Sequence, residues 1–176
     1  ALAARANYLA EDRSDIQFAV KELCRGMSSP TEEDWTKLKH LGRYLLNKVR
    51  HRTIYRYRGI VSEITVTTDT DYAGCYKTRK STSGGIIQHG DHTIKTWSTT
   101  QSVISLSSGE AEYYGMVRGA AQAIGVRSML EDIGIKKTIT VRTDASAAKG
   151  IATRKGMGRV RHIEVNQLWM QDKVAS

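Results

Sequence analysis

The chain has 176 residues, of which 40% are apolar, so we expect one packed domain with at most a short appendage and exclude wholesale disorder. Lysine and arginine number 27 against 18 aspartates and glutamates, and the resulting net charge of +9 favours a polyanionic partner such as nucleic acid. There is no apolar run long enough to cross a bilayer and no signal peptide, so we expect an intracellular protein with no membrane partner.

The cysteines and histidines form no metal-binding pattern. Cys24 and Cys75 are far apart, which is typical of reduced thiols inside a cell, and the five histidines are scattered. We therefore expect no zinc site. The chain opens at Ala1, in helix-like sequence and without an initiator methionine, so we expect a fragment of a longer protein.

Residues 1–52 are predicted to be mostly helical. A first amphipathic helix covers residues 15–27, with apolar side chains at helical spacing at Ile16, Val20, Leu23, Cys24 and Met27.

A second helix is predicted to begin with Ser29 as N-cap, Pro30 at the first helical position and Glu32 in a capping box, and to end near Lys48. Its apolar stripe comprises Trp35, Leu38, Leu41, Leu45 and Leu46.

From residue 53 the pattern changes to strands and further helices. Alternation with period two predicts strands at 53–57 and 63–68, a hairpin of 84–89 with 93–97, and a strand at 138–143. Helices are predicted from a cap at Ser107 or Ser108 to Asp132, where Gly134 ends the helix, then at 145–153 and from 163 to the end. Counted from Glu63, this order predicts an α/β fold, in which a three-strand antiparallel meander and one parallel strand share a sheet flanked by helices.

Carboxylates occur where two of these strands end. Asp69 ends the first long strand, Asp144 ends the strand after the long helix, and Glu110 and Glu112 lie in the first turns of that helix. Adjacent parallel strands bring their carboxyl ends together, so three acids can converge there. Such a cluster favours hard cations such as Mg²⁺ or Mn²⁺, and two such ions can activate water and stabilise a leaving oxygen. Taken singly, each acid is equally well explained as a turn former or a helix-dipole partner.

Six sequence blocks in order resemble the ribonuclease H domain of copia-type retrotransposons. They are 68–74 (TDTDYAG), 79–85 (RKSTSGG), 97–98 (WS), 105–113 (SLSSGEAEY), 143–148 (TDASAA) and 161–164 (RHIE). The helical stretch before them resembles the segment that joins the reverse transcriptase to this domain in the same polyproteins. The resemblance covers nearly the whole chain, and it implies residues 1–58 as a connector and residues 59–176 as a ribonuclease H-like domain.

The resemblance implies Asp69, Glu112 and Asp144 as catalytic residues and ligands of two Mg²⁺ ions, with Mn²⁺ able to substitute. Glu112 is preferred to Glu110 because the family's helical acid is followed by apolar residues at +1, +4, +5 and +8, whereas Glu110 has Arg118 at +8. Asp71 is expected to be structural or to support the ligands.

Two departures from the family pattern are visible. Ribonucleases H carry a fourth acid after a fifth strand, so we expect the chain to end before both, and we expect Glu164 to be structural rather than a substitute ligand. Ala145 stands where the family commonly has Asn.

The stretch 149–161 is basic and contains no acid. It is interpreted either as a phosphate-contacting edge or as a solvated loop. Its cations are Lys149, Arg154, Lys155, Arg159 and Arg161.

The function that the resemblance implies is endonucleolytic hydrolysis of the RNA strand of RNA–DNA hybrids, with in-line attack and a 5′-phosphate product. The implied partners are the hybrid and the reverse transcriptase domain, with no small-molecule cofactor, in cytoplasm, virus-like particles or nucleus. The alternative is an inactive remnant that binds nucleic acid or docks to the reverse transcriptase. An integrase or transposase core is disfavoured, because there the helical Glu follows the second Asp, whereas Glu112 precedes Asp144.

Overall fold

The computed structural model describes residues 1–156, 158, 163 and 167–175 of the chain. These fall into two compact units, one formed by residues 1–55 with 97–99 and the other by residues 56–96 with 100–176. Of the helices in the described part of the chain, none combines the length and the apolar character that crossing a membrane requires.

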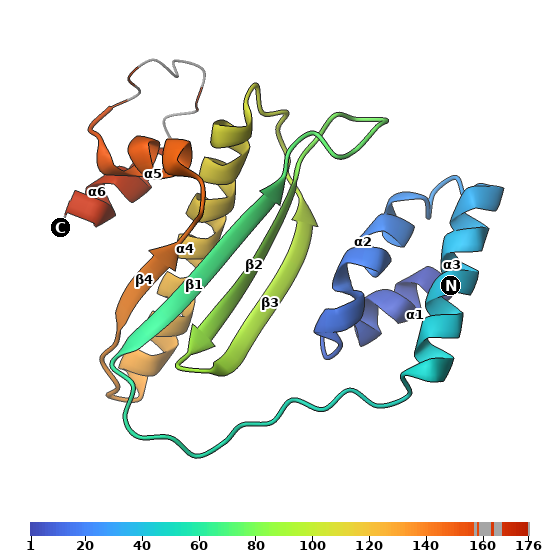
Figure 1. The fold of residues 1–176 in the computed structure, drawn as a ribbon, viewed down its shortest axis with the longest axis horizontal. Coiled ribbons are helices and arrows are strands. Elements are labelled where there is room, and N and C mark those ends of the chain that lie inside the picture. Colours follow the sequence, from blue (N-terminus) through green and yellow to red (C-terminus); the bar gives the residue numbers. More distant parts are fainter. Residues whose placement is uncertain (157, 159–162, 164–166, 176) are drawn as a thin grey trace. The chain divides into compact units, whose positions relative to one another are not determined.

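The first unit is helical. Its elements are α1 (Leu2–Leu9), a 3₁₀ turn η1 (Ser14–Ile16), α2 (Gln17–Arg25) and α3 (Glu32–Asn47) (Figure 1). The side chains at its centre are Ala10, Ile16, Val20, Leu23 and Leu41.

The predicted first helix is shorter than expected. The apolar stripe is confirmed for its first four members, but Met27 is 51% exposed, because α2 ends at Arg25 and Gly26 follows it as C-cap. On α3, Leu38 and Leu45 pack on the same core, whereas Leu46 is 77% exposed and does not belong to the stripe. Trp35 is 49% exposed.

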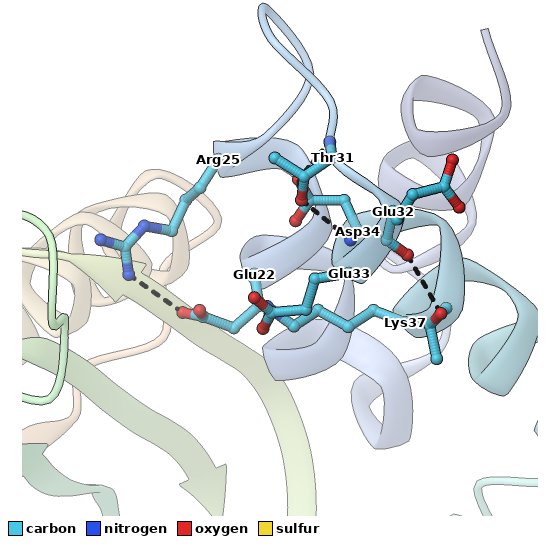
Figure 2. A network of polar contacts seen from close by, with 8 residues as sticks. Glu22, Arg25, Thr31, Glu32, Glu33, Asp34 and Lys37 are labelled. Carbon is cyan, nitrogen blue, oxygen red and sulfur yellow. Dashed lines mark hydrogen bonds and ion pairs between the residues drawn. The ribbon is translucent and has the colours of Figure 1, made fainter.

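The predicted cap of α3 was wrong. The N-cap is Thr31 rather than Ser29, so Pro30 precedes the helix and Glu32 is its first residue. The Asp34 N–H donates to the Thr31 hydroxyl, and the Thr31 N–H donates in return to the Asp34 carboxylate at 3.0 Å (Figure 2). This reciprocal pair satisfies two backbone donors at once. A capping box of Ser29 with Glu32 would instead start the helix two residues earlier than the structure does.

The second unit is built on a mixed sheet. Its elements are β1 (Glu63–Asp71), β2 (Thr82–His89), β3 (His92–Thr100, apart from 97–99), α4 (Ser108–Asp132), β4 (Thr138–Arg142), α5 (Ser146–Thr153) and α6 (Trp169–Ala175). The strand order is β3-β2-β1-β4, with β1 antiparallel to β2 and parallel to β4. The predicted α/β class and topology are therefore confirmed, and they are consistent with a ribonuclease H-like fold.

Two further elements differ from prediction. Residues 53–57, all of them described, form no strand, although they alternate as one. The last helix, predicted from residue 163, is α6 beginning at Trp169, and residues 164–166 lie outside the described residues.

Helix α4 lies across one face of the sheet and also packs on α5 (Figure 1). Ser107 caps its N-terminus. The helix ends at Asp132 as predicted, and it is followed by Gly134, whose φ of +81° favours glycine. There the N–H of Ile135 donates to the Leu130 carbonyl and that of Gly134 to the Glu131 carbonyl, the two bonds of a Schellman motif. The core beneath α4 comprises Tyr113, Met116, Val117, Ala120, Ala148, Ile151, Ala152, Ile163 and Met170.

Candidate metal centre

The strand register places Asp69 and Asp144 side by side. Thr67 of β1 is paired with Arg142 of β4, and each acid follows its strand's paired residue by two positions. Parallel neighbours advance by the same rise per residue, so the two acids reach the same level at the carboxyl edge of the sheet. Asp69 is also held by β2, since it pairs with Gly84.

Glu112 reaches this edge because two glycines let α4 come close to its neighbours. A Cβ atom on Gly115 would lie 2.6 Å from the Thr70 hydroxyl oxygen of β1, and one on Gly109 would lie 2.7 Å from the Ala147 Cβ of α5. Both distances are too short for real carbon contacts. The glycines stand three residues before and three after Glu112, so the two close approaches hold the turn of helix that carries it.

The three carboxylates form one cluster. Asp69, Glu112 and Asp144 each offer one oxygen, and these atoms all lie within 4.8 Å of one another. The N–H of Thr70 donates both to Asp69 Oδ1, at 2.9 Å, and to Glu112 Oε1, at 3.2 Å. A single backbone donor therefore links the end of β1 to α4.

The cluster is electrostatically unfavourable when it is empty. Burial raises the pKa of Glu112 above its usual value, and the negative charges of Asp69 and Asp144 raise it further, while the bond from the Thr70 N–H acts in the opposite direction. Glu112 Oε2 is buried and has no hydrogen-bond partner among the described residues. A buried carboxylate oxygen without a donor, facing two more carboxylates, is the situation that a divalent cation corrects.

The chemistry of the donors suits a hard cation. All three side chains offer oxygen, and no described histidine or cysteine joins the cluster. Oxygen-only ligand sets suit Mg²⁺, Mn²⁺ or Ca²⁺ and not zinc. These residues could therefore hold a metal ion.

Glu110, the rejected alternative to Glu112, has a different environment. Its carboxylate accepts hydrogen bonds from the Leu106 N–H at 2.8 Å and from the Tyr114 hydroxyl at 3.0 Å, and its own N–H donates to the Ser107 hydroxyl. It is 2% exposed and closes the N-terminus of α4. Two acids two positions apart thus separate into a capping residue and a member of the cluster.

Asp71 does not join the cluster. Its carboxylate lies against Gly74, where a Cβ atom would overlap it, so it packs over the turn after β1. After β4, the N–H of Ala145 donates to the Thr143 hydroxyl, so the turn that carries Asp144 is closed without a polar side chain at residue 145.

The predicted basic edge is only partly described. Lys149 lies on α5 and lines a hollow between α4, β4, α5 and α6, and Lys155 is exposed. The Arg154 guanidinium lies against Gly158. Arg159 and Arg161 lie outside the described residues, and so does Glu164.

Sequence reasoning missed the residues that set the geometry around the acids. Gln101 is buried and donates both to the Ser83 hydroxyl of β2 and to the Ala111 carbonyl of α4, each at 2.8 Å, while Ser105 donates to its side-chain oxygen. It joins sheet and helix beside Glu112. Glycines inside a helix were the one available signal for the close approaches; nothing in the pattern around Gln101 indicated its role.

Comparisons with known proteins place the chain in context. The retrovirus-related Pol polyprotein from transposon RE1 of Arabidopsis thaliana is 31% identical to it over 172 residues, and that from transposon RE2 of the same plant is 29% identical over 172 residues. Each alignment covers 96% of this chain, but the chain spans only 12% of the length of either polyprotein. An uncharacterized mitochondrial protein of Arabidopsis thaliana is 34% identical over 115 residues, which are 65% of this chain and 48% of that protein.

No protein-family model matches the chain, and no solved structure matches it either. The similarity to the polyproteins nevertheless runs through both compact units, since it covers nearly all residues. The chain is thus distantly homologous, at about 30% identity, to copia-type retrotransposon Pol polyproteins.

Proposed function

We propose that this chain is the ribonuclease H region of such a polyprotein and that it hydrolyses the RNA strand of RNA–DNA hybrids with the help of divalent metal ions. The observation that carries the proposal is the convergence of Asp69, Glu112 and Asp144 at the carboxyl edge of a β3-β2-β1-β4 sheet. The net charge of +9 supports a nucleic-acid substrate.

Each of the three acids has a defined task in this proposal. Asp69 and Asp144 are exposed and are open to both the ions and the substrate, while Glu112 contributes its unpaired Oε2 from the inner side. Two Mg²⁺ ions bound there would supply activation of a water molecule and stabilisation of the leaving oxygen. The Thr70 N–H holds the Asp69 and Glu112 carboxylates so that ion binding requires little rearrangement.

The substrate would be held mainly through its backbone. Recognition of a hybrid rests on phosphates and 2′-hydroxyls, so we expect little sequence preference. Lys149, Arg154 and Lys155, with Arg159 and Arg161, are proposed as phosphate contacts. Residues 1–58 are proposed as the connector to a reverse transcriptase domain, and residues 59–176 as the nuclease domain.

The test is cleavage of a hybrid labelled on its RNA strand, in Mg²⁺ and in EDTA. Cleavage should require the metal and should disappear in Asp69→Asn and Asp144→Asn, while both variants keep binding the hybrid. Asp71→Asn is the matched control, because it is the same substitution on the same strand at a carboxylate outside the cluster. Cleavage that survives in Asp69→Asn, or that is lost equally in Asp71→Asn, would refute the proposed site.

A further inference from the structure

The segment between α3 and β1 has a composition that the proposed nuclease does not use. Residues 48–60, here named the basic–tyrosine segment, form neither helix nor strand (Figure 1), and every one of them is exposed. The segment contains five cations and no acid. They are Lys48, Arg50, Arg52, Arg56 and Arg58.

Two exposed tyrosines lie among these cations. Tyr57 is 99% exposed and Tyr55 is 60% exposed. Residues 53–57 do alternate in the pattern that predicted a strand, but in the structure they form no strand. Wherever the chain is extended here, residues two apart share a side, which would put Tyr55 and Tyr57 on one side and Arg56 on the other.

The backbone around Tyr57 is anchored although its ring is not. The carbonyl of Arg56 is hydrogen-bonded to His92 Nε2 at 2.7 Å, and the Arg58 guanidinium pairs with Asp91 in the turn between β2 and β3. Further along, the Val61 carbonyl is bonded to His89 Nε2 at 3.1 Å. The ring of Tyr57 is therefore presented to solvent from a fixed main chain, which lowers the entropy cost of using it for binding.

We propose that the basic–tyrosine segment binds single-stranded nucleic acid, with Tyr55 and Tyr57 stacking on bases and the arginines contacting phosphates. Positions two apart in an extended chain are about 6.6 Å apart, close to twice the ~3.4 Å rise of one nucleotide, so one base fits between the two rings. Alternating rings and cations are the combination that single-strand-binding grooves use.

A single strand fits better than a duplex for a physical reason. In a duplex the base faces are covered by neighbouring bases, so exposed rings gain nothing from them, whereas unpaired bases present both faces. The inference does not depend on the three acids or on hydrolysis. It concerns residues that precede β1 in the chain, whereas Asp69 follows most of that strand, and it can succeed or fail independently of the nuclease.

The experiment is fluorescence anisotropy of labelled oligothymidine and of a labelled RNA–DNA hybrid, in EDTA so that nothing is cleaved. Tyr55→Ala with Tyr57→Ala should weaken oligothymidine binding about tenfold or more, as loss of base–aromatic stacking does. Tyr55→Phe with Tyr57→Phe should keep the affinity, because the ring remains. Binding of the hybrid should change less.

The arginines are tested through salt dependence. Replacing Arg50, Arg52 and Arg56 by Gln should lower the slope of log affinity against log salt by about 2, since each phosphate contact on a single strand contributes about 0.7. The control removes three exposed cations elsewhere, by Arg5→Gln, Arg43→Gln and Lys136→Gln, and should change the slope less.

Three results would overturn the inference. The first is unchanged oligothymidine affinity in the double alanine variant, and the second is an equal loss of affinity for oligothymidine and for the hybrid in that variant. The third is an equal change of the salt slope in the triple arginine variant and in the triple control variant. All variants lie outside the two cores, so unchanged thermal unfolding verifies that they are folded.

Discussion

Two carboxylates, one in each unit of this protein, have opposite surroundings. In the helical unit, Asp15 receives two hydrogen bonds from the Arg13 guanidinium, at 2.9 and 2.8 Å, and one from the Tyr44 hydroxyl at 2.8 Å. In the sheet unit, Glu112 faces two further carboxylates and leaves one oxygen without a donor among the described residues. Both oxygens of the Asp15 carboxylate thus have hydrogen-bond donors from the protein, whereas only one oxygen of Glu112 has a donor among the described residues.

The pKa values express this difference. Hydrogen bonding from Arg13 holds the pKa of Asp15 well below its usual range, whereas burial and neighbouring charge raise the pKa of Glu112. A lowered carboxyl pKa marks a stabilising contact, and a raised one marks a carboxylate whose charged form is disfavoured by burial and by nearby negative charge. An unfavourable environment of this kind, on α4 beside two strand ends, is what distinguishes Glu112 as a candidate functional acid from the structural Asp15.

The largest effect is expected from Glu112→Gln on metal binding. Mg²⁺ should raise the unfolding temperature of the unmodified protein. When the ion is at a hundred times its dissociation constant, the free energy of unfolding should increase by about 2.7 kcal/mol. In Glu112→Gln this rise should vanish, and hybrid cleavage should fall more than about a hundredfold, beyond the cost of losing an outer-shell partner. Differential scanning fluorimetry over a Mg²⁺ series measures the first and the cleavage assay the second.

Glu110→Gln is the matched control for that experiment. It is the same substitution on the same helix, but it weakens the charged bonds to Leu106 and Tyr114. It should lower stability and keep the response to Mg²⁺. A retained Mg²⁺ response in Glu112→Gln would remove this residue from the site.

The next effect concerns the close approach of α4 to β1. Gly115→Ala should destabilise the sheet unit by about 1–3 kcal/mol, because the added methyl overlaps the Thr70 hydroxyl. Thr70→Ala in the same chain should recover most of that loss, since it removes the obstructing atom, and urea unfolding of the single and double variants measures the coupling. If the stability losses of Gly115→Ala and Thr70→Ala simply add in the double variant, this contact does not set the position of the helix.

The pH dependence of stability sharpens the contrast between the units. Asp15 stabilises the fold above its ordinary pKa of 3.8, and this stability is lost as the pH falls through its lower folded value. Asp15→Asn should therefore be less stable than the unmodified protein at neutral pH, with a gap that narrows on acidification.

Glu112 should give the opposite sign in EDTA. Its ionised form costs stability above its raised pKa, and the cost disappears as the pH falls towards the ordinary value of 4.5. Glu112→Gln should therefore be more stable than the unmodified protein at neutral pH, with a gap that also narrows in acid. Thermal unfolding followed by circular dichroism across the acid range measures both gaps; a less stable Glu112→Gln would contradict the raised pKa.

The smallest effect is expected at the basic edge. Lys149→Gln and Lys155→Gln should each lower the slope of log hybrid affinity against log salt by about 0.9 if each contacts one phosphate of a duplex. Affinity measured at several salt concentrations tests this. Lys173→Gln on α6, outside the predicted stretch, serves as the comparison, and an equal effect there would favour a solvated loop.

Pattern alone was enough for the regular elements of the sheet unit. Residues 63–68, the 84–97 hairpin and the 107–132 helix carry their own periodicity, cap and terminating glycine, so local physics decided them. The order of these elements also limited the topology, because a crossover helix between parallel strands leaves few arrangements. Asp69 and Asp144 could be placed at one edge for that reason.

Tertiary contacts decided what periodicity could not. Residues 53–57 alternate like a strand, but a strand needs a neighbouring strand to bond with, and alternation does not supply one. Likewise, Glu110 and Glu112 lie close together on one helix, but Leu106 and Tyr114 donate to both oxygens of Glu110, whereas Thr70 donates only to Oε1 of Glu112. The Glu110 donors are only four residues away, but the Thr70 donor and the two acids that face Glu112 come from other elements of the chain, so the difference between the two acids emerges only when the chain is folded.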